Sequence, residues 1–143
     1  MSDDPGVADE YPKGGQQLLY EPFDRGLIAA IRHSVAKLAE GAGLRHQRLD
    51  DFILAVNEIM TNAVRYAGGG GMLTLSQQDG QLQCTVSDDG PGIPPEWLRP
   101  GHTPPALALS GRGLWLARRL CDDVKIRTSP HGTTVLLAVV LPN

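Results

Sequence analysis

The chain has 143 residues, a length that suggests one domain able to bury a core of its own. Apolar residues make up 41% of it and the formal net charge is -3, so we expect a folded protein without a broad basic surface for nucleic acid. It contains neither an apolar stretch of about 18 residues nor a basic start followed by an apolar run, which favours a cytoplasmic protein without a membrane span.

The chain begins with a polar segment, residues 1–14, whose prolines, glycines and acids predict a loose leader. We expect one domain from 15 to 143. "QQLLYEP", residues 16–22, is typical of a short strand. Asp24 is then placed to cap a helix that runs to about Glu40 and stops at "GAG".

The second helix is predicted over residues 47–67, ending in four consecutive glycines. Its apolar residues form one wide arc, and the polar side includes Glu58 and Asn62, which lie four residues apart and therefore on one face. A short ExxxN match of this kind is ordinarily a solvated polar face.

An antiparallel hairpin is predicted next, because residues 72–78 and 81–88 alternate apolar and polar side chains around "DG" at 79 and 80. This places Asp88 at the end of a strand. Residues 89–110 are rich in proline and glycine and long for a connection. We interpret residues 89–110 as a candidate lid, and we expect the prolines of residues 93–110 to prevent regular helix or strand pairing there.

A third helix is expected from Gly113 to about Cys121, followed by a closing hairpin turned by "PHG". The order of elements, β-α-α-β-β-loop-α-β-β, predicts an α+β fold with an antiparallel or mixed sheet covered by helices on one face. Cys84 and Cys121 have no CxxC spacing and lie within predicted elements, so we interpret them as small core residues, not as a disulfide or metal site.

Three glycine-bearing motifs follow the ExxxN helix. "VSDDGPGI" places Asp88 before Gly90 and Gly92, which allows a sharp backbone turn and a close approach to a flat ligand. "SGRGLWLARRL" places Gly111 and Gly113 before a helix, where free backbone N–H groups favour phosphate. Each motif alone is equally typical of a tight turn.

"HGTTV" sets Gly132, Thr133 and Thr134 at the start of the last strand. The two hydroxyls there could face a ligand or belong simply to a β-rich segment.

The four motifs together, in this order, resemble the N, G1, G2 and G3 boxes of the GHKL (Bergerat-fold) ATPase and kinase superfamily over residues 51–140. Within it the chain is similar to the bacterial anti-sigma factor serine/threonine kinases. The resemblance implies a two-layer α/β sandwich with a mixed, mostly antiparallel sheet, and it implies the cofactors ATP and Mg²⁺.

The resemblance also implies residue roles. Asn62 would give its amide oxygen to Mg²⁺. Glu58 would accept the proton of the attacking hydroxyl as the catalytic base. Asp88 would accept a hydrogen bond from the adenine amine, and Gly90 and Gly92 would let the chain pass the base.

The remaining family positions would complete the nucleotide site. Residues of the third and fourth boxes would bind the phosphates and close the base pocket: Gly111, Arg112, Gly113, Leu114, Gly132, Thr133 and Thr134. Arg99 and Arg112 could add a charge clamp.

The partner implied is a protein, either an anti-anti-sigma protein or a sigma factor, and because members of this family often dimerise, a homodimer stays open. Three alternatives remain at this point. The protein could be an ATP-binding regulator that sequesters its partner with little kinase activity. It could be the ATPase domain of a histidine kinase, which fits less well because no helix pair with a phosphoacceptor histidine precedes the motifs. It could also be a structural domain with coincidental glycines.

Overall fold

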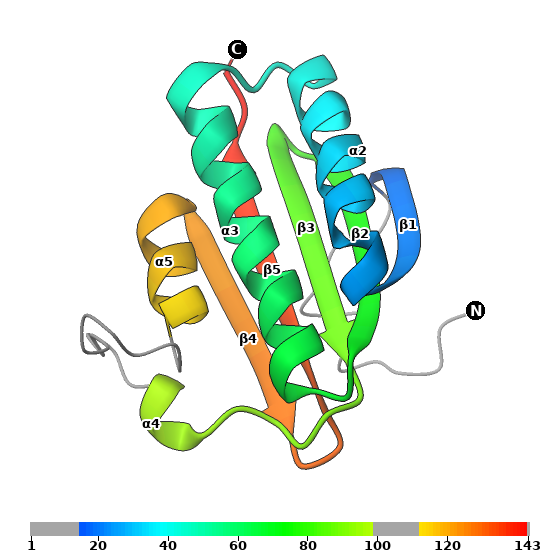
Figure 1. Cartoon of the computed structure of the whole chain (residues 1–143). Coiled ribbons are helices and arrows are strands. Elements are labelled where there is room, and N and C mark those ends of the chain that lie inside the picture. The colour runs from blue at the N-terminus through cyan, green and yellow to red at the C-terminus, as the bar shows by residue number, and fades with distance from the viewer. Residues whose placement is uncertain (1–14, 99–111, 143) are drawn as a thin grey trace.

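The structure, a computed structural model, describes residues 15–98 and 112–142 (Figure 1). The predicted leader, Arg99, Gly111 and the larger part of the candidate lid lie outside these residues. The described elements follow the predicted order with two additions, η1 and α4. They are β1 (Gln16–Asp24), the 3-10 turn η1 (Arg25–Leu27), α2 (Ile28–Gly41), α3 (His46–Tyr66), β2 (Gly70–Gln78), β3 (Gln81–Asp88), α4 (Pro95–Leu98), α5 (Arg112–Leu120), β4 (Asp123–Ser129) and β5 (Gly132–Val140).

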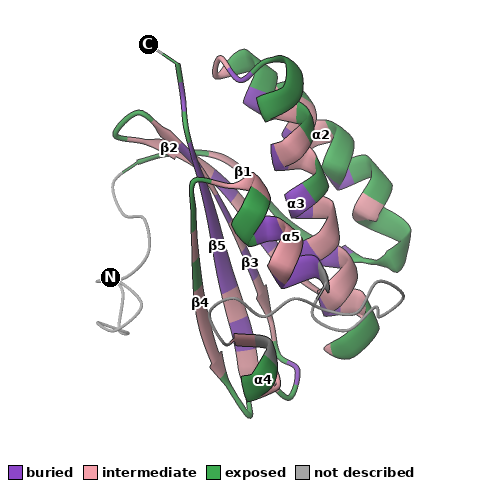
Figure 2. Cartoon of the chain, turned by 90° about the vertical axis from the view of Figure 1, so that its left-hand side faces the viewer, coloured by how far each residue is buried: buried purple, intermediate pink, exposed green. Residues whose placement is uncertain are grey.

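The strands of the described residues form one sheet in the order β1-β2-β3-β5-β4, and every neighbouring pair is antiparallel. Helices α2, α3 and α5 all lie on the same face of this sheet, and the buried residues gather between the two layers (Figures 1 and 2). The predicted α+β sandwich is therefore confirmed, and the sheet is antiparallel throughout the part described.

The alternation in the sequence decides which face of each strand is buried. Leu82, Cys84 and Val86 of β3 are at most 2% exposed and face the helices, because alternate side chains of a strand point to opposite faces. The β2–β3 turn has positive φ at both Asp79 (52°) and Gly80 (76°), the backbone that matches the twist of a two-residue hairpin.

Two local predictions were wrong. Asp24 makes no side-chain hydrogen bond to a helix N-terminus, because it is still paired with Gly70 at the end of β1 and a 3-10 turn follows it. The prolines were expected to prevent helix in residues 93–110, but Pro95 is the first residue of the single turn α4. Proline is tolerated there because the N–H that it lacks is not needed at the first position of a helix.

Helix α3 crosses the middle of the sheet. Its buried side packs on the core through Phe52, Val56, Ile59 and Met60, all at most 3% exposed. The burial of these apolar residues fixes the rotation of α3 and leaves its polar side on the margin of the core.

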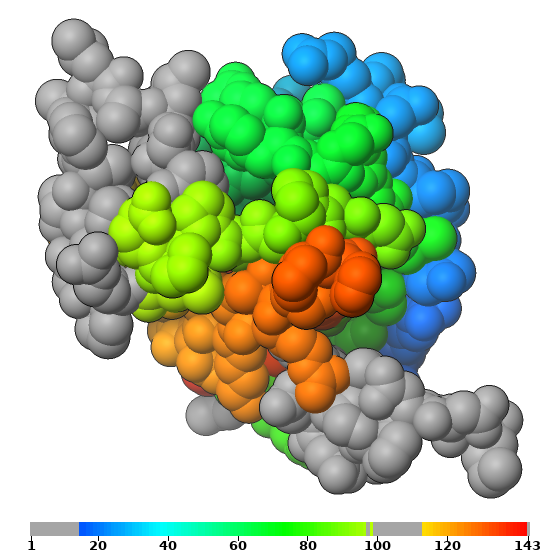
Figure 3. All heavy atoms as spheres, turned by 90° about the horizontal axis from the view of Figure 1, so that it is seen from below, coloured from blue at the N-terminus to red at the C-terminus, as the bar shows by residue number. Residues whose placement is uncertain are grey.

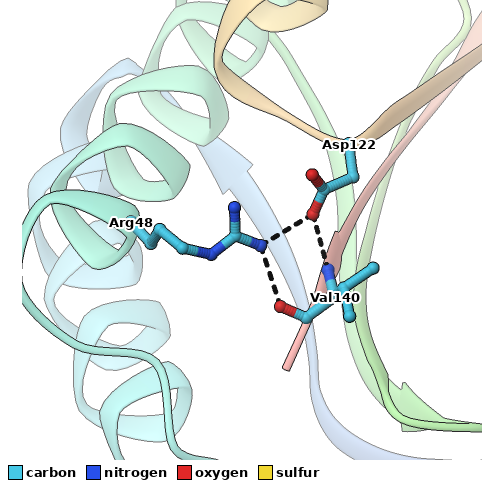
Figure 4. Close-up of polar contacts among 3 residues, drawn as sticks. All are labelled: Arg48, Asp122 and Val140. Atoms are coloured by element: carbon cyan, nitrogen blue, oxygen red, sulfur yellow. Dashed lines mark hydrogen bonds and ion pairs between the residues drawn. The ribbon is translucent and has the colours of Figure 1, made fainter. Parts of the chain in front are cut away.

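The start of α3 is fastened to the far ends of α5 and β5 by a polar cluster (Figure 4). The Arg48 guanidinium donates to Asp122 Oδ2 over 2.7 Å and to the carbonyl of Val140 over 2.8 Å. The backbone N–H of Val140 donates to the same Asp122 oxygen over 2.7 Å. The Arg48 hydrogen bond and then the Val140 N–H hold the pKa of Asp122 below its ordinary value.

Candidate nucleotide site

One row of polar side chains crosses the sheet at the end nearest the β4–β5 turn. Asp88 of β3 pairs with Thr133 of β5, which pairs in turn with Thr128 of β4. Asp88 and Thr133 follow the parity of the buried positions on β3 and β5, and Thr128 follows that of Val124 and Ile126, which pack against the core, so all three lie on the face that the helices cover. The pairing of three strands thus brings together residues that are up to 45 positions apart in the sequence.

Asp88 is a half-buried carboxylate at the centre of this end. Its Oδ1 accepts a hydrogen bond of 2.9 Å from the backbone N–H of Gly90, two residues further on. Burial raises the pKa of Asp88 above its ordinary value, while hydrogen bonds from the N–H groups of Gly90 and Thr133 oppose that rise. The carboxylate is therefore partly desolvated and retains acceptor capacity for a ligand.

A cavity of about 330 Å³ opens above this row, within the range of small-molecule sites. Its polar side chains are Asn62, Asp88, Thr133 and the hydroxyl of Tyr66, and the rest of the lining is apolar or backbone. The lining residues are Ile59, Asn62, Ala63, Tyr66, Ala67, Val86, Asp88, Pro91, Gly92, Ile93, Pro94, Leu114, Thr133 and Val135. An apolar slot with one carboxylate at its edge suits a flat base that carries an amine.

Asn62 lies where α3 meets the start of α5. A Cβ at Gly113 would stand 2.5 Å from Asn62 Nδ2 and 3.2 Å from Oδ1, so only glycine lets the two helices meet with this amide between them. Leu114, the next residue, is 2% exposed and lines the cavity. The predicted first and third boxes are therefore in direct contact.

Gly92 lines the cavity with a backbone that only glycine adopts readily. Its φ is +94°, and a Cβ there would collide with the carbonyl oxygen of Ser129 and stand 3.0 Å from Thr128 Oγ1. The space freed by this glycine is filled by the β4–β5 hairpin and not left for a ligand.

Several predicted positions lie beside the cavity and do not line it. A Cβ added at Gly90 would stand 2.5 Å from the Cβ of Ala67, so Gly90 packs directly on Ala67. Gly132 packs on the backbone of Asp88 in the same way. Thr134 points to the other face of the sheet, where its hydroxyl lies 3.2 Å from that of Ser87. The side chains of the two threonines of the last box therefore lie on opposite faces of the sheet.

Glu58 is half-buried on α3, one turn before Asn62, and lies outside the described lining of the cavity. Arg112 begins α5, but its side chain is not described. The structure therefore brings Asn62, Asp88, Gly92, Leu114 and Thr133 together around one cavity.

Sequence reasoning missed Thr128 and Ile93. The backbone N–H of Ile93 donates to Thr128 Oγ1 over 2.9 Å, and the hydroxyls of Thr128 and Thr133 lie 2.8 Å apart. The signal was present, because a two-residue turn at 130 and 131 places Thr128 directly opposite Thr133.

A family model of the histidine kinase-like ATPase domain matches residues 22–139. The chain belongs to this family. Membership makes it a nucleotide-using protein, in agreement with the cavity described above.

Relatives within the histidine kinase-like ATPase family are protein kinases and anti-sigma factors. The serine-protein kinase RsbW of Listeria innocua is 30% identical over 111 residues, which cover 69% of this chain and 71% of the relative. The anti-sigma F factor of Clostridium acetobutylicum is 30% identical over 114 residues, covering 74% and 80%. RsbW of Bacillus subtilis is 26% identical over 132 residues, covering 84% and 82%.

Solved structures support the same fold. A chain of the SiaB–SiaC complex from Pseudomonas aeruginosa matches with a TM-score of 0.67 and 11% identity, over 94% of each chain. The structure of the RsbU and RsbW domains of a Mycobacterium tuberculosis protein matches with a TM-score of 0.63 and 20% identity, over 86% of this chain and 31% of that one.

Two further findings concern residues 15–98 and 112–142. No group of three or more His, Cys, Asp or Glu side chains there is arranged to hold a metal ion. None of the helices in these ranges has both the length and the apolar character needed to cross a membrane.

Proposed function

We propose that the protein is a Mg²⁺-ATP-dependent serine/threonine kinase of the anti-sigma factor type, which phosphorylates a hydroxyl of a protein partner. The observation that carries this proposal is the cavity in which Asp88, Thr133, Asn62 and Leu114 meet, at the junction of the family's four motifs.

Asp88 recognises the adenine base. Its carboxylate accepts a hydrogen bond from the exocyclic amine, which guanine replaces with an oxygen that would face the carboxylate unfavourably. The flat faces of the base pack against the apolar lining, including Ile59, Val86 and Ile93. Removing base and lining from water provides affinity, and the single carboxylate provides selectivity.

The phosphates lie toward the start of α5. The first backbone N–H groups of a helix have no partner within it, and the helix dipole favours an anion there. Asn62 would hold Mg²⁺ through its amide oxygen, together with phosphate oxygens. The cation neutralises phosphate charge when bound.

Glu58 is the proposed proton acceptor. On α3 it precedes Asn62 by one turn on the same face, which sets it near the phosphate end of the site. The partner's hydroxyl oxygen bonds to the γ-phosphorus, the bond from that phosphorus to the bridging oxygen breaks to release ADP, and the hydroxyl proton passes to the Glu58 carboxylate.

The partner we propose is an anti-anti-sigma-type protein carrying the acceptor serine or threonine, and a sigma factor is the second protein that this type of kinase would bind. A regulator that only sequesters its partner is not favoured, because the relatives include serine-protein kinases. A histidine-kinase ATPase domain is not favoured for the same reason.

Calorimetric titration with ATP, in the presence and absence of Mg²⁺, tests the nucleotide site. We expect wild type to bind ATP more tightly with Mg²⁺, and Asn62→Ala to lose most of that enhancement while metal-free binding stays within about threefold. Equal losses with and without the metal would contradict the role of Asn62. Absence of ATP binding by wild type would overturn the proposed function.

A further inference from the structure

We propose that Thr128 is a positioning residue that gives the base pocket its selectivity, because it fixes the direction of the Thr133 hydroxyl and holds the loop of Gly92 and Ile93 against the site. This inference rests on the proposed binding of ATP. Thr128 lies on β4, outside all four sequence motifs and outside the described lining of the cavity.

The Thr128 hydroxyl takes part in two hydrogen bonds, one with Ile93 and one with Thr133. The backbone N–H of Ile93 can only donate, so Thr128 Oγ1 accepts it, over 2.9 Å. The hydroxyls of Thr128 and Thr133 lie 2.8 Å apart and either can donate to the other; in the proposed arrangement Thr128, whose oxygen already accepts from Ile93, is the donor. With its oxygen engaged as an acceptor, Thr133 has its own proton left to donate.

The Thr133 hydroxyl lies at the wall of the cavity. Thr133 lines the cavity and is 7% exposed, so its hydroxyl lies in a site from which water is largely excluded. Its backbone N–H is close enough to the Asp88 carboxylate to lower the pKa of that group. The pocket therefore presents an acceptor, Asp88, beside a donor, Thr133.

Adenine has the complementary order along one edge, an amine donor at N6 beside the acceptor N1. Guanine has the reverse order, an oxygen beside an N–H. A pocket with fixed hydrogen-bond directions rejects the reversed pattern strongly, because its buried polar groups would remain unpaired. The Thr133 hydroxyl serves this selection only while Thr128 holds its direction.

Thr128 also contacts the segment after β3, which contains Gly92 and Ile93. Figure 3 shows the segment after β3 lying between α3 and the β4–β5 hairpin. Thr128 fastens this segment through Ile93, and the absence of a Cβ at Gly92 lets the backbone reach the hairpin. Ile93 also lines the cavity. The Thr128 hydroxyl therefore fixes the position of one wall of the pocket and also the direction in which the Thr133 hydroxyl donates.

The test is titration of wild type, Thr128→Val and Thr128→Ser with ATP and with GTP. Valine keeps the shape and loses the hydroxyl, so we expect about tenfold weaker ATP binding, unchanged GTP binding and a correspondingly smaller preference for ATP. Serine keeps the hydroxyl and should restore both values to within about twofold. Thr85→Val, on the helix-free face of β3, is the matched control and should bind like wild type.

A second measurement does not depend on nucleotide. Amide hydrogen exchange by NMR should show Ile93 protected in nucleotide-free wild type and in Thr128→Ser, and exchanging at least tenfold faster in Thr128→Val. An unprotected Ile93 amide in wild type would overturn the role of Thr128 even if the valine variant failed to fold.

The outcomes separate the two proposals. If wild type binds ATP selectively and Thr128→Val matches it in affinity and preference, the role of Thr128 is overturned and the kinase proposal stands. If serine fails to restore what valine loses, the hydroxyl is not responsible and the role is likewise overturned. If wild type binds no ATP, the proposed function falls, and this role falls with it.

Discussion

At the scale of single residues, Asp88 lowers the stability of the nucleotide-free protein when its carboxylate is ionised. Its carboxylate is partly desolvated, and burial raises its pKa against the two backbone hydrogen bonds that stabilise the charge. A carboxylate with a raised pKa favours the folded state fully below the unfolded-state pKa, and this contribution is lost as pH rises through the folded-state pKa. At neutral pH the ionised Asp88 therefore costs stability that the bound nucleotide would recover.

We predict that Asp88→Asn raises the melting temperature of the nucleotide-free protein at pH 7. The gain should shrink as pH falls through the window between the folded and unfolded pKa values, because Asp88 becomes protonated there and its charge penalty disappears. The same variant should lose most ATP affinity, since its amide can present a donor to the adenine amine. Thermal denaturation from pH 3 to 8 and calorimetry provide the measurements. A lower melting temperature at pH 7 would contradict the prediction.

Some residues of the site could be predicted from the sequence and others could not. Asp88 and Asn62 could be found from motif order, because each box is a short, local pattern. Thr133 and Thr134 could not be separated without strand parity, which sends Thr133 to the cavity and Thr134 to Ser87 on the other face. Thr128 was missed because its importance comes from a cross-strand partner, which is found only once the two-residue turn at 130 and 131 is used to set the register.

At the scale of elements, the contact between α3 and α5 joins the Asn62 amide, the proposed Mg²⁺ ligand, to the start of α5, where the phosphates are proposed to lie. Gly113→Ala tests it. Alanine is a better helix former than glycine and the Asn62 amide is the end of a side chain that can swing away, so the free energy of unfolding should change by about 1 kcal/mol or less.

Displacement of the Asn62 amide by Gly113→Ala should nevertheless weaken Mg²⁺-dependent ATP binding by about tenfold or more. Denaturant unfolding and calorimetry measure the two effects. Gly41→Ala at the end of α2, where a Cβ meets nothing within 4 Å, is the matched control and should leave ATP affinity intact. Full Mg²⁺-ATP affinity in Gly113→Ala would show that this contact is unimportant.

The cluster of Arg48, Asp122 and Val140 joins three elements at the opposite end. The Arg48 and Asp122 side chains are 50% and 38% exposed, so solvent screening limits the pair to about 0.5–1 kcal/mol. We predict that Arg48→Met lowers the free energy of unfolding by about that amount at pH 7.

The pH dependence of Arg48→Met follows from the lowered pKa of Asp122. Its contribution to stability is present above the unfolded-state pKa and is lost as pH falls through the folded-state pKa, so the difference between wild type and variant should narrow in acid to the part that the Arg48 hydrogen bond to the Val140 carbonyl contributes. Denaturant unfolding at several pH values measures this, with Lys37→Met on the exposed side of α2 as a control for removing one positive charge. A difference that stays constant as the pH is lowered until Asp122 is protonated in the folded state would exclude the Asp122 carboxylate as a source.

Elements with strong periodicity could be predicted from the sequence, because alternation and helical spacing are local. The β2–β3 hairpin and α3 agree with the prediction to within two residues. Asp24 and Pro95 could not be placed, since pairing with Gly70 and the start of a single helical turn depend on where neighbouring segments pack.

At the scale of the whole molecule, the antiparallel order β1-β2-β3-β5-β4 is what creates the site. It inserts the last strand beside β3, so that the end of β3 and the start of β5 meet beneath the C-terminal half of α3. Motif order along the chain indicates the family, but this proximity follows only from strand pairing between distant segments.

The central claim is that the protein transfers the γ-phosphoryl group of ATP to a protein hydroxyl. The direct measurement is transfer of radiolabel from γ-labelled ATP to a partner isolated on the immobilised full chain, comparing wild type with Glu58→Gln at matched nucleotide occupancy. Glutamine keeps the size of the side chain and removes the proton acceptor.

We predict labelling of serine or threonine by wild type, reduced about 10²–10⁴-fold in Glu58→Gln while ATP binding is retained. A wild-type protein that binds both ATP and partner and transfers no label would contradict the account.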